Sequence, residues 1–206
     1  MKKRFTNSLL VAMLVIFSFI SQNNFANANQ SDDADKFYSL GISYVKASEW
    51  KLAIENFKKT SVLDPENPKI YSLLALCYTS TKEYDLAIEN FKLAIEKCNM
   101  KILTLDPQDY KPFLGDVYEA LGLVYYEKKE NDLAIESFKK ALESKPDNAK
   151  LYVQIGDAYA QKTIINHNRA DYKKVQKYYE KALSLDPTNS GIQFKVKMIK
   201  IIISRL

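Results

Sequence analysis

The sequence contains few glycine, histidine and cysteine residues. Its 206 residues are 47% hydrophobic and include five Gly, two Cys and one His. So few glycines in an apolar chain suit an all-helical protein with one repeat domain. A lone His167, without a Cys or carboxylate cluster at ligand spacing, is a poor metal site and is better explained as a solvated loop residue. We therefore expect no metal and no cofactor.

The sequence also lacks the arrangements of residues that carry catalysis. It has no Ser/His/Asp or Cys/His set, no Gly-rich phosphate loop and no paired-carboxylate signature. Its carboxylates are scattered, as they are on any solvated array of helices. We therefore predict that the protein is not an enzyme.

The two cysteines are predicted to remain unpaired. Cys77 and Cys98 fall on successive predicted helices, whose turn lies near Thr81–Glu83. At about 1.5 Å per residue, their different distances from that turn separate them along the hairpin by roughly 17 Å. A disulfide tolerates Cα separations of only about 7 Å. Two buried thiols are expected, and a redox pair is not.

The N-terminus has the features of an export signal. Basic residues 2–4 precede the apolar run Leu9–Ile20, and Ala26-Asn27-Ala28 is a typical cleavage pattern. We predict a signal peptide over residues 1–28 and a periplasmic or secreted protein. The alternative is an uncleaved N-terminal membrane anchor, although the run is shorter than the roughly 20 residues that a span needs.

Removing this segment leaves a nearly balanced charge. Residues 1–28 contain three basic and no acidic residues, so the remainder has 27 Lys or Arg, 25 Asp or Glu and a net charge of +2. This balance gives no electrostatic reason to expect nucleic acid as a partner.

A repeated pattern organises the rest of the chain. Within Gly115–Asn148, apolar, small and Pro residues stand at the offsets of a 34-residue helical hairpin repeat, and the same pattern returns three more times. The residues that form it are Tyr118, Leu121, Gly122, Tyr125, Ala134, Phe138, Ala141 and Pro146. The chain thus resembles the tetratricopeptide-repeat family. The resemblance implies an all-α solenoid of stacked hairpins, because one hairpin cannot bury its apolar face alone.

Spacings between equivalent residues define the predicted repeats. The small residues Gly41, Ala75, Gly122 and Gly156 are 34, 47 and 34 apart, so 13 extra residues lie in the second repeat. Seven more fall around Thr163–Ala170 in the fourth, where a loop is expected. The predicted division is a polar leader (29–33), repeats over 34–67, 68–109 with an extended second helix, 115–148 and 149–189 with the inserted loop, and a C-terminal helix (190–206).

The resemblance also implies a binding surface. In this family the first helices of the repeats line a concave groove that holds an extended peptide or a helix of another protein. By offset, the groove residues here are Tyr38, Ile42, Lys69, Leu76, Glu119, Leu123, Tyr126, Lys150 and Asp157. The alternative is that these residues only pack between helices. We expect a scaffold or adaptor that binds another protein outside the cytoplasm.

The C-terminal helix carries two apolar stripes at helical spacing. One consists of Ile192, Val196, Ile199, Ile203 and Leu206, and the other of Phe194, Met198 and Ile201. The first is expected to seal the last repeat, and the second to be a further contact surface. We favour self-association as a homodimer, with a partner helix, a membrane surface or burial within the chain as alternatives. Two other functions stay open: a self-associating structural protein, and an accessory subunit of an envelope enzyme complex.

Overall fold

The computed structural model describes residues 31–104, 107–166 and 169–205, and every regular element in them is an α-helix. The prediction of an all-α protein is confirmed. The described residues fall into two compact units, of which unit 1 ends at Glu66 and unit 2 begins at Asn67. The predicted signal peptide (1–28), His167 and Leu206 lie outside the described residues.

Unit 1 is one helical hairpin. A helix over residues 31–46 precedes α2 (Trp50–Leu63). Residues 31–33, which were predicted to belong to the polar leader (29–33), are helical and form part of this helix.

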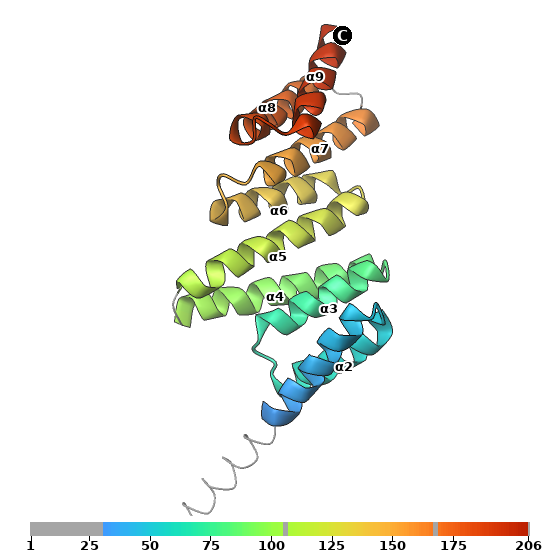
Figure 1. Cartoon of the computed structure of the whole chain (residues 1–206), viewed down its shortest axis with the longest axis vertical. Helices are drawn as coiled ribbons and strands as arrows, with labels where there is room; N and C mark the ends of the chain where they lie inside the picture. Colours follow the sequence, from blue (N-terminus) through green and yellow to red (C-terminus); the bar gives the residue numbers. More distant parts are fainter. Residues whose placement is uncertain (1–30, 105–106, 167–168, 206) are drawn as a thin grey trace, which may run out of the picture. The chain divides into compact units, whose positions relative to one another are not determined.

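Unit 2 contains three further hairpins and a last helix, which succeed one another along the stack in Figure 1. The hairpins are α3–α4, α5–α6 and α7–α8. Each packs on the next through α4 and α5 or α6 and α7, and α9 packs on α8. The helices are α3 (Pro68–Ser80), α4 (Tyr84–Thr104), α5 (Pro107–Glu127), α6 (Asn131–Ser144), α7 (Ala149–Asn166), α8 (Arg169–Leu185) and α9 (Ser190–Ser204).

Three of the turns inside the hairpins share one backbone motif. In the α3–α4 turn, the Glu83 N–H donates to the Tyr78 carbonyl at 2.8 Å, across Lys82 with φ 63°. Lys129 (φ 63°) and, in unit 1, Ser48 (φ 60°) take the same place in their turns. This is the Schellman motif, in which one residue adopts the left-handed conformation that Gly adopts without strain.

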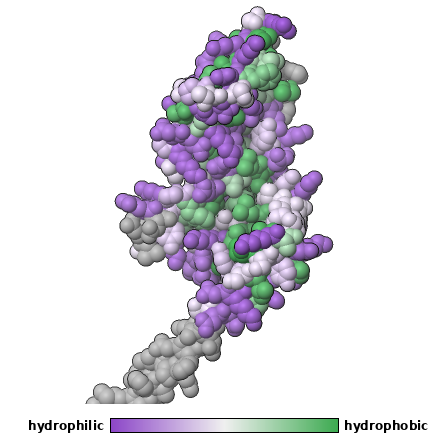
Figure 2. Space-filling view, viewed as in Figure 1, coloured by the Kyte–Doolittle hydropathy of each residue, from purple (hydrophilic) through white to green (hydrophobic). Residues whose placement is uncertain are grey.

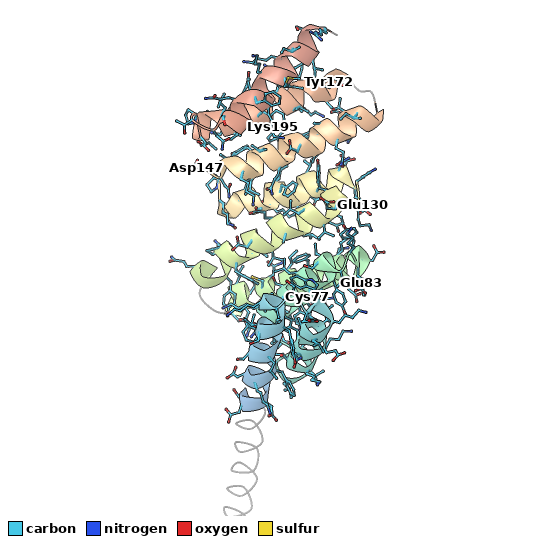
Figure 3. The ribbon with its side chains drawn as sticks, turned by 45° about the vertical axis from the view of Figure 1, so that its right-hand side comes forward. Cys77, Glu83, Glu130, Asp147, Tyr172 and Lys195 are labelled. Atoms are coloured by element: carbon cyan, nitrogen blue, oxygen red, sulfur yellow. The ribbon has the colours of Figure 1, made fainter. Side chains whose placement is uncertain are left out.

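The turns alternate between the two sides of unit 2. Glu83 and Glu130 end the turns inside their hairpins, and Figure 3 shows them on the same side of the stack. Asp147, which lies between two hairpins, is on the opposite side. The first helices of the hairpins therefore run in the same direction, and α3 contacts α5 directly.

Small residues at the helix crossings let aromatic rings approach the first helices closely. A Cβ atom on Gly122 would lie 2.6 Å from the ring of Phe138, and one on Gly156 would lie 2.5 Å from the ring of Tyr179. Both rings are buried. Tyr179 is bulkier than the Phe of the other hairpins, but the last hairpin packs as closely as they do.

The 13 extra residues of the second repeat lie in two long helices. α4 and α5 have 21 residues each, against 14 for α6. α5 begins at Pro107 and contains Pro112 in its interior. Pro107 already takes the first helical position, where a missing N–H costs little. The helix α4 of the second repeat thus ends at Thr104, and the first helix of the third repeat begins at Pro107. The sequence had placed the boundary between these repeats at residues 109–115.

The loop predicted over Thr163–Ala170 is largely helical. α7 extends to Asn166 and α8 begins at Arg169. Thr163 is fully buried, and its hydroxyl donates to the Tyr159 carbonyl at 2.8 Å. The described part of the insertion thus lengthens α7 and α8.

The two cysteines are free and buried, as predicted. Burial raises the pKa of the Cys77 and Cys98 thiols to about 11. The Cys98 thiol lies 3.5 Å from the Tyr110 carbonyl, to which it can donate. A thiol with a raised pKa is a poor nucleophile, because the thiolate is the reactive form.

Candidate functional site: the first-helix face of unit 2

The first-helix face is the side of unit 2 formed by α3, α5, α7 and α9. Asparagine side chains cap three of these helices: Asn67 accepts from the Lys69 N–H, Asn148 from the Leu151 N–H and Asn189 from the Ile192 N–H. Because the caps are equivalent, they align α9 with the repeats. In this alignment Met198 is equivalent in position to Leu76 and Asp157. Phe194 is equivalent to Ser72 and Val153. The second stripe of the C-terminal helix therefore continues the predicted groove.

Unit 1 contributes two of the predicted groove residues, Tyr38 and Ile42. Both are half-buried. The ring of Tyr38 meets the buried ring of Phe57 edge-on, with centroids 6.1 Å apart. Within unit 1, Tyr38 thus has a packing role, which was the alternative interpretation.

Unit 2 contributes the other seven predicted residues. Lys69 and Leu76 lie exposed on α3, and Leu123 lies exposed on α5. Leu76 and Leu123 expose 45% and 40% of their surface, although both are apolar. Glu119 on α5 pairs with Lys150 on α7 at 2.9 Å. On the visible face of unit 2 in Figure 2, hydrophobic atoms gather in the middle of the stack between hydrophilic flanks.

A small hollow, the α5–α7 hollow, lies between two consecutive first helices. It has a volume of about 90 Å³ and is lined by Leu123 and Tyr126 of α5, Phe138 of α6, and Gln154 and Asp157 of α7. The structure thus brings three of the predicted residues together here. Burial, and then the charge of Asp157, raises the pKa of Tyr126. The buried Gln154 Oε1 has no hydrogen-bond partner among the described residues.

A larger hollow, the α7–α9 hollow, occupies the equivalent place one hairpin later. Its volume is about 210 Å³. Its rim is formed by Ile164 of α7 and by Phe194, Met198 and Ile202 of α9, and Tyr172 of α8 contributes to its lining. Figure 3 shows Tyr172 close to the C-terminal end of the stack. Nearly all of the exposed lining is apolar, which makes this hollow suitable for an apolar group.

Asp157 links the two hollows. The Tyr179 hydroxyl and the Lys195 ammonium both donate to Asp157 Oδ1, each at 2.6 Å. The Lys195 Nζ also lies 5.3 Å from the centroid of the Tyr179 ring. Burial, and then the hydrogen bond to Asp157, raises the pKa of Tyr179, so the hydroxyl remains a donor. This cluster ties α7, α8 and α9 together.

The two stripes of α9 have different surroundings. Ile192, Val196 and Ile199 are buried in one cluster with residues of α8, as predicted for the sealing stripe. On the other side, Phe194 exposes 64% and Met198 39% of its surface.

The membership of the exposed stripe needs one correction. Ile202 is exposed and lines the α7–α9 hollow, whereas Ile201 is half-buried and is not among the lining residues. The exposed stripe is therefore Phe194, Met198 and Ile202, because a spacing of four residues keeps side chains on the side that faces α7.

Sequence reasoning missed several residues of these hollows, among them Ile164, Gln154 and Tyr172. Ile164 fell inside the predicted loop, although its distance of eight residues from Gly156 would have placed it on α7. Gln154 stands two residues before Gly156, which is not one of the groove positions that the family resemblance implies. Tyr172 lies on the second helix α8, outside the first helices that the family resemblance implies for the groove, and it lines the larger hollow.

The described residues offer no group of three His, Cys, Asp or Glu side chains that could hold a metal ion. Among the same residues, no helix combines the length and the apolar character that crossing a membrane requires. The two hollows and the exposed apolar stripe of α9 are the concave and apolar features of this face.

Three family profiles match the sequence. A tetratricopeptide-repeat profile covers residues 38–100, a second, described as TPR repeat, covers 122–162, and a third tetratricopeptide-repeat profile covers 165–189. Together the matched residues make up more than half of the chain. The chain is a tetratricopeptide-repeat protein. A search of curated protein sequences finds no match.

Solved structures of similar fold agree with this assignment. The crystal structure of MamA is 29% identical, covers 75% of this chain and 78% of its own, and has a TM-score of 0.61. MamA from Desulfovibrio magneticus RS-1 is 15% identical, covers 82% and 85%, and has a TM-score of 0.68. The Cut9–Hcn1 hetero-tetramer is 16% identical, covers 81% of this chain and 29% of its own, and has a TM-score of 0.63. These likenesses confirm the all-α tetratricopeptide-repeat solenoid fold, and together with the matched repeats they support a protein–protein interaction scaffold.

Proposed function

We propose that this protein is an exported scaffold or adaptor that holds a peptide or helix of another protein on the first-helix face of unit 2. The proposed residues of this face are Lys69, Leu76, Glu119, Leu123, Tyr126, Lys150 and Asp157, together with Gln154. Leu76 and Leu123 support the proposal because both are apolar, exposed and equivalent in register. Single exposed apolar residues are common on any surface, but a row of them beside a hollow indicates an interaction site.

The observation that carries the proposal is the chemistry of the α5–α7 hollow. Leu123 and Phe138 give it an apolar lining, and the unpartnered Gln154 Oε1 is buried beside it. The exposed apolar lining contacts water in the unbound protein. A docked peptide would cover Leu123 with a side chain and remove this surface from water. A hollow of about 90 Å³ suits a small aliphatic side chain of such a peptide.

Export is proposed from residues 1–28 alone, on the basis of the basic head, the apolar run and the Ala26-Asn27-Ala28 pattern. We expect the mature chain to begin at Asn29. N-terminal sequencing of the protein from its native compartment tests this. An intact Met1 in a membrane fraction would favour the anchored alternative.

The binding proposal is tested with a crosslinked pull-down on the mature protein, followed by identification of the captured partner. The variant Leu76→Ser with Leu123→Ser should capture much less of that partner. The matched control is Leu86→Ser with Leu133→Ser, because these leucines have similar exposures of 39% and 43% but lie on the second helices α4 and α6. Equal capture by both double variants would indicate that Leu76 and Leu123 only pack between helices.

A further inference from the structure

The α7–α9 hollow is large enough to take up a bulky side chain. Its volume is about 210 Å³, against about 90 Å³ for the α5–α7 hollow. An apolar cavity of about 150 Å³ already binds benzene. Ile164, Phe194, Met198 and Ile202 line the larger hollow and are all exposed. A Phe ring or a Leu side chain from another molecule would fit among them and remove their apolar surface from water.

The C-terminal part of the sequence, which contains the helices of this hollow, has an excess of basic residues. Residues 160–206 contain ten Lys or Arg and three Asp or Glu. The helix α9 contains three lysines and no acidic residue. Of these lysines, Lys195 is neutralised by Asp157 at 2.6 Å and Lys200 by Glu180 at 2.9 Å. Lys197 is exposed and forms no ion pair within the described ranges.

Two unpaired cations flank the exposed stripe of α9. At about 100° per residue, Arg205 projects about 20° and Lys197 about 60° from Phe194 on the helix circumference. Both side chains are exposed, and for neither does the described part of the chain supply a carboxylate. A ligand seated on Phe194 and Met198 would therefore bring its flanking residues close to positive charge.

This charge argues against the homodimer that the sequence suggested. Two copies that met through the same stripe would bring Lys197 and Arg205 of both copies into one interface. Like charges across an interface cost free energy, whereas complementary charges favour the encounter. The charge favours an acidic partner over a second copy.

We propose that the α7–α9 hollow anchors one bulky apolar side chain of an acidic, amphipathic segment of a partner protein, with carboxylates of that segment paired to Lys197 and Arg205. The proposal rests on the proposed function and extends it, because it names the chemistry of the partner at the C-terminal end of the first-helix face.

The probes are three synthetic amphipathic helical peptides that share one apolar face centred on a Phe. Their polar positions carry Glu in the first peptide, Gln in the second and Lys in the third. Affinity for the mature protein is measured by fluorescence anisotropy at two salt concentrations. We expect the Glu peptide to bind at least about tenfold more tightly than the Lys peptide. Added salt should reduce this ratio. Replacing the central Phe with Ala should weaken binding of the Glu peptide by about tenfold or more.

Matched variants of the protein locate the site. Met198→Glu should weaken binding of the Glu peptide, while Met100→Glu, at another exposed methionine on α4, should not. Lys197→Glu with Arg205→Glu should weaken it more than Lys173→Glu with Lys177→Glu, which changes the net charge equally at two exposed residues of α8.

Several outcomes would overturn the proposal. Equal affinities of the Glu and Lys peptides, or no binding of the Glu peptide at about 1 mM, would exclude an acidic ligand. Sedimentation of the protein with phosphatidylglycerol vesicles, lost in Met198→Glu, would assign the stripe to a membrane. A concentration-dependent dimer lost in the same variant would assign it to a second copy. If Leu76→Ser with Leu123→Ser abolishes partner capture while Met198→Glu leaves both capture and peptide binding unchanged, the proposed function stands and this extension of it fails.

Discussion

The hydroxyl of Tyr179 donates a hydrogen bond of 2.6 Å to Asp157. Each of these residues departs from the repeat pattern, and each departure supplies a partner for the other. In the other hairpins an apolar residue stands at the position of Asp157 and a Phe at that of Tyr179. The equivalent pairs are Ile42 and Phe57, Leu76 and Phe91, and Leu123 and Phe138. The extra hydroxyl and its acceptor thus form one polar contact within an otherwise apolar crossing.

The first prediction is that these two residues are energetically coupled. Asp157→Leu alone should destabilise the protein by about 1–3 kcal/mol, because it leaves the buried Tyr179 hydroxyl without its acceptor. Adding Tyr179→Phe should recover part of the loss, because the pair then matches the other hairpins, whereas Lys195 still lacks the Asp157 carboxylate. The free energies of unfolding come from urea denaturation, and a double-mutant cycle isolates the coupling. Strict additivity of the two substitutions would contradict the account.

The second prediction concerns the close helix crossing at Gly122. Gly122→Ala should destabilise the protein, because the new Cβ would lie 2.6 Å from the Phe138 ring, and Gly122→Leu should cost about 1–3 kcal/mol. Gly191→Ala is the control, since its Cβ would meet only the Asn189 side chain at 3.3 Å. Gly191 stands in the first turn of α9, so this substitution should change the stability less than Gly122→Ala. Equal melting temperatures for the two Ala variants would count against a close crossing.

The third prediction uses the left-handed residues of the turns. Lys129→Gly should stabilise the protein by up to about 1 kcal/mol, because Gly adopts a positive φ without the steric cost that a Lys side chain carries. Lys139→Gly, at an exposed position inside α6, should instead cost about 1 kcal/mol. Thermal melts of both variants show whether the sign of the effect follows the backbone conformation.

The fourth prediction is a pH dependence from the buried thiols. The pKa of Cys77 and Cys98 rises from 9.0 to about 11 on folding, because burial disfavours the thiolate. Between these values the unfolded chain holds fewer protons than the folded protein. The stabilising contribution is therefore complete below pH 9 and declines as the pH rises toward 11. Replacing both cysteines with Ala should flatten the fall in stability over this range.

The same burial predicts slow alkylation of the cysteines. Iodoacetamide at pH 8 should modify Cys77 and Cys98 slowly in the folded protein and rapidly in urea. Mass spectrometry follows the modification with time. Rapid modification in the absence of urea would contradict the buried positions of the two thiols.

Much of the fold could be predicted from the sequence, because the packing residues recur at fixed offsets. Gly122, Gly156 and their aromatic partners are local features of a pattern that repeats every 34 residues. The spacing also showed where extra residues lie. It did not show their conformation, since a loop and a longer helix contain the same number of residues. Thr163 illustrates this, because its burial in the last hairpin depends on neighbours that the periodicity does not reveal.

The candidate site was predictable only in part. Offsets placed Leu123, Tyr126 and Asp157 on one face, and the structure gathers these three around the α5–α7 hollow. The hollow between α7 and α9 depends on the direction in which α9 packs, and this decides that Ile202 rather than Ile201 joins the exposed stripe. The ion pair of Lys195 with Asp157 spans 38 positions along the chain, so no local pattern could have indicated it.

The central claim, that the first-helix face of unit 2 binds a partner protein, is tested most directly by the affinity of the mature protein for its captured partner. Isothermal titration calorimetry should be carried out on the parent, on Leu76→Ser with Leu123→Ser, and on the control Leu86→Ser with Leu133→Ser. The account predicts at least about a tenfold loss of affinity for the first variant only, with the helical circular dichroism spectrum retained by all three. Equal affinities for the parent and both variants would contradict it.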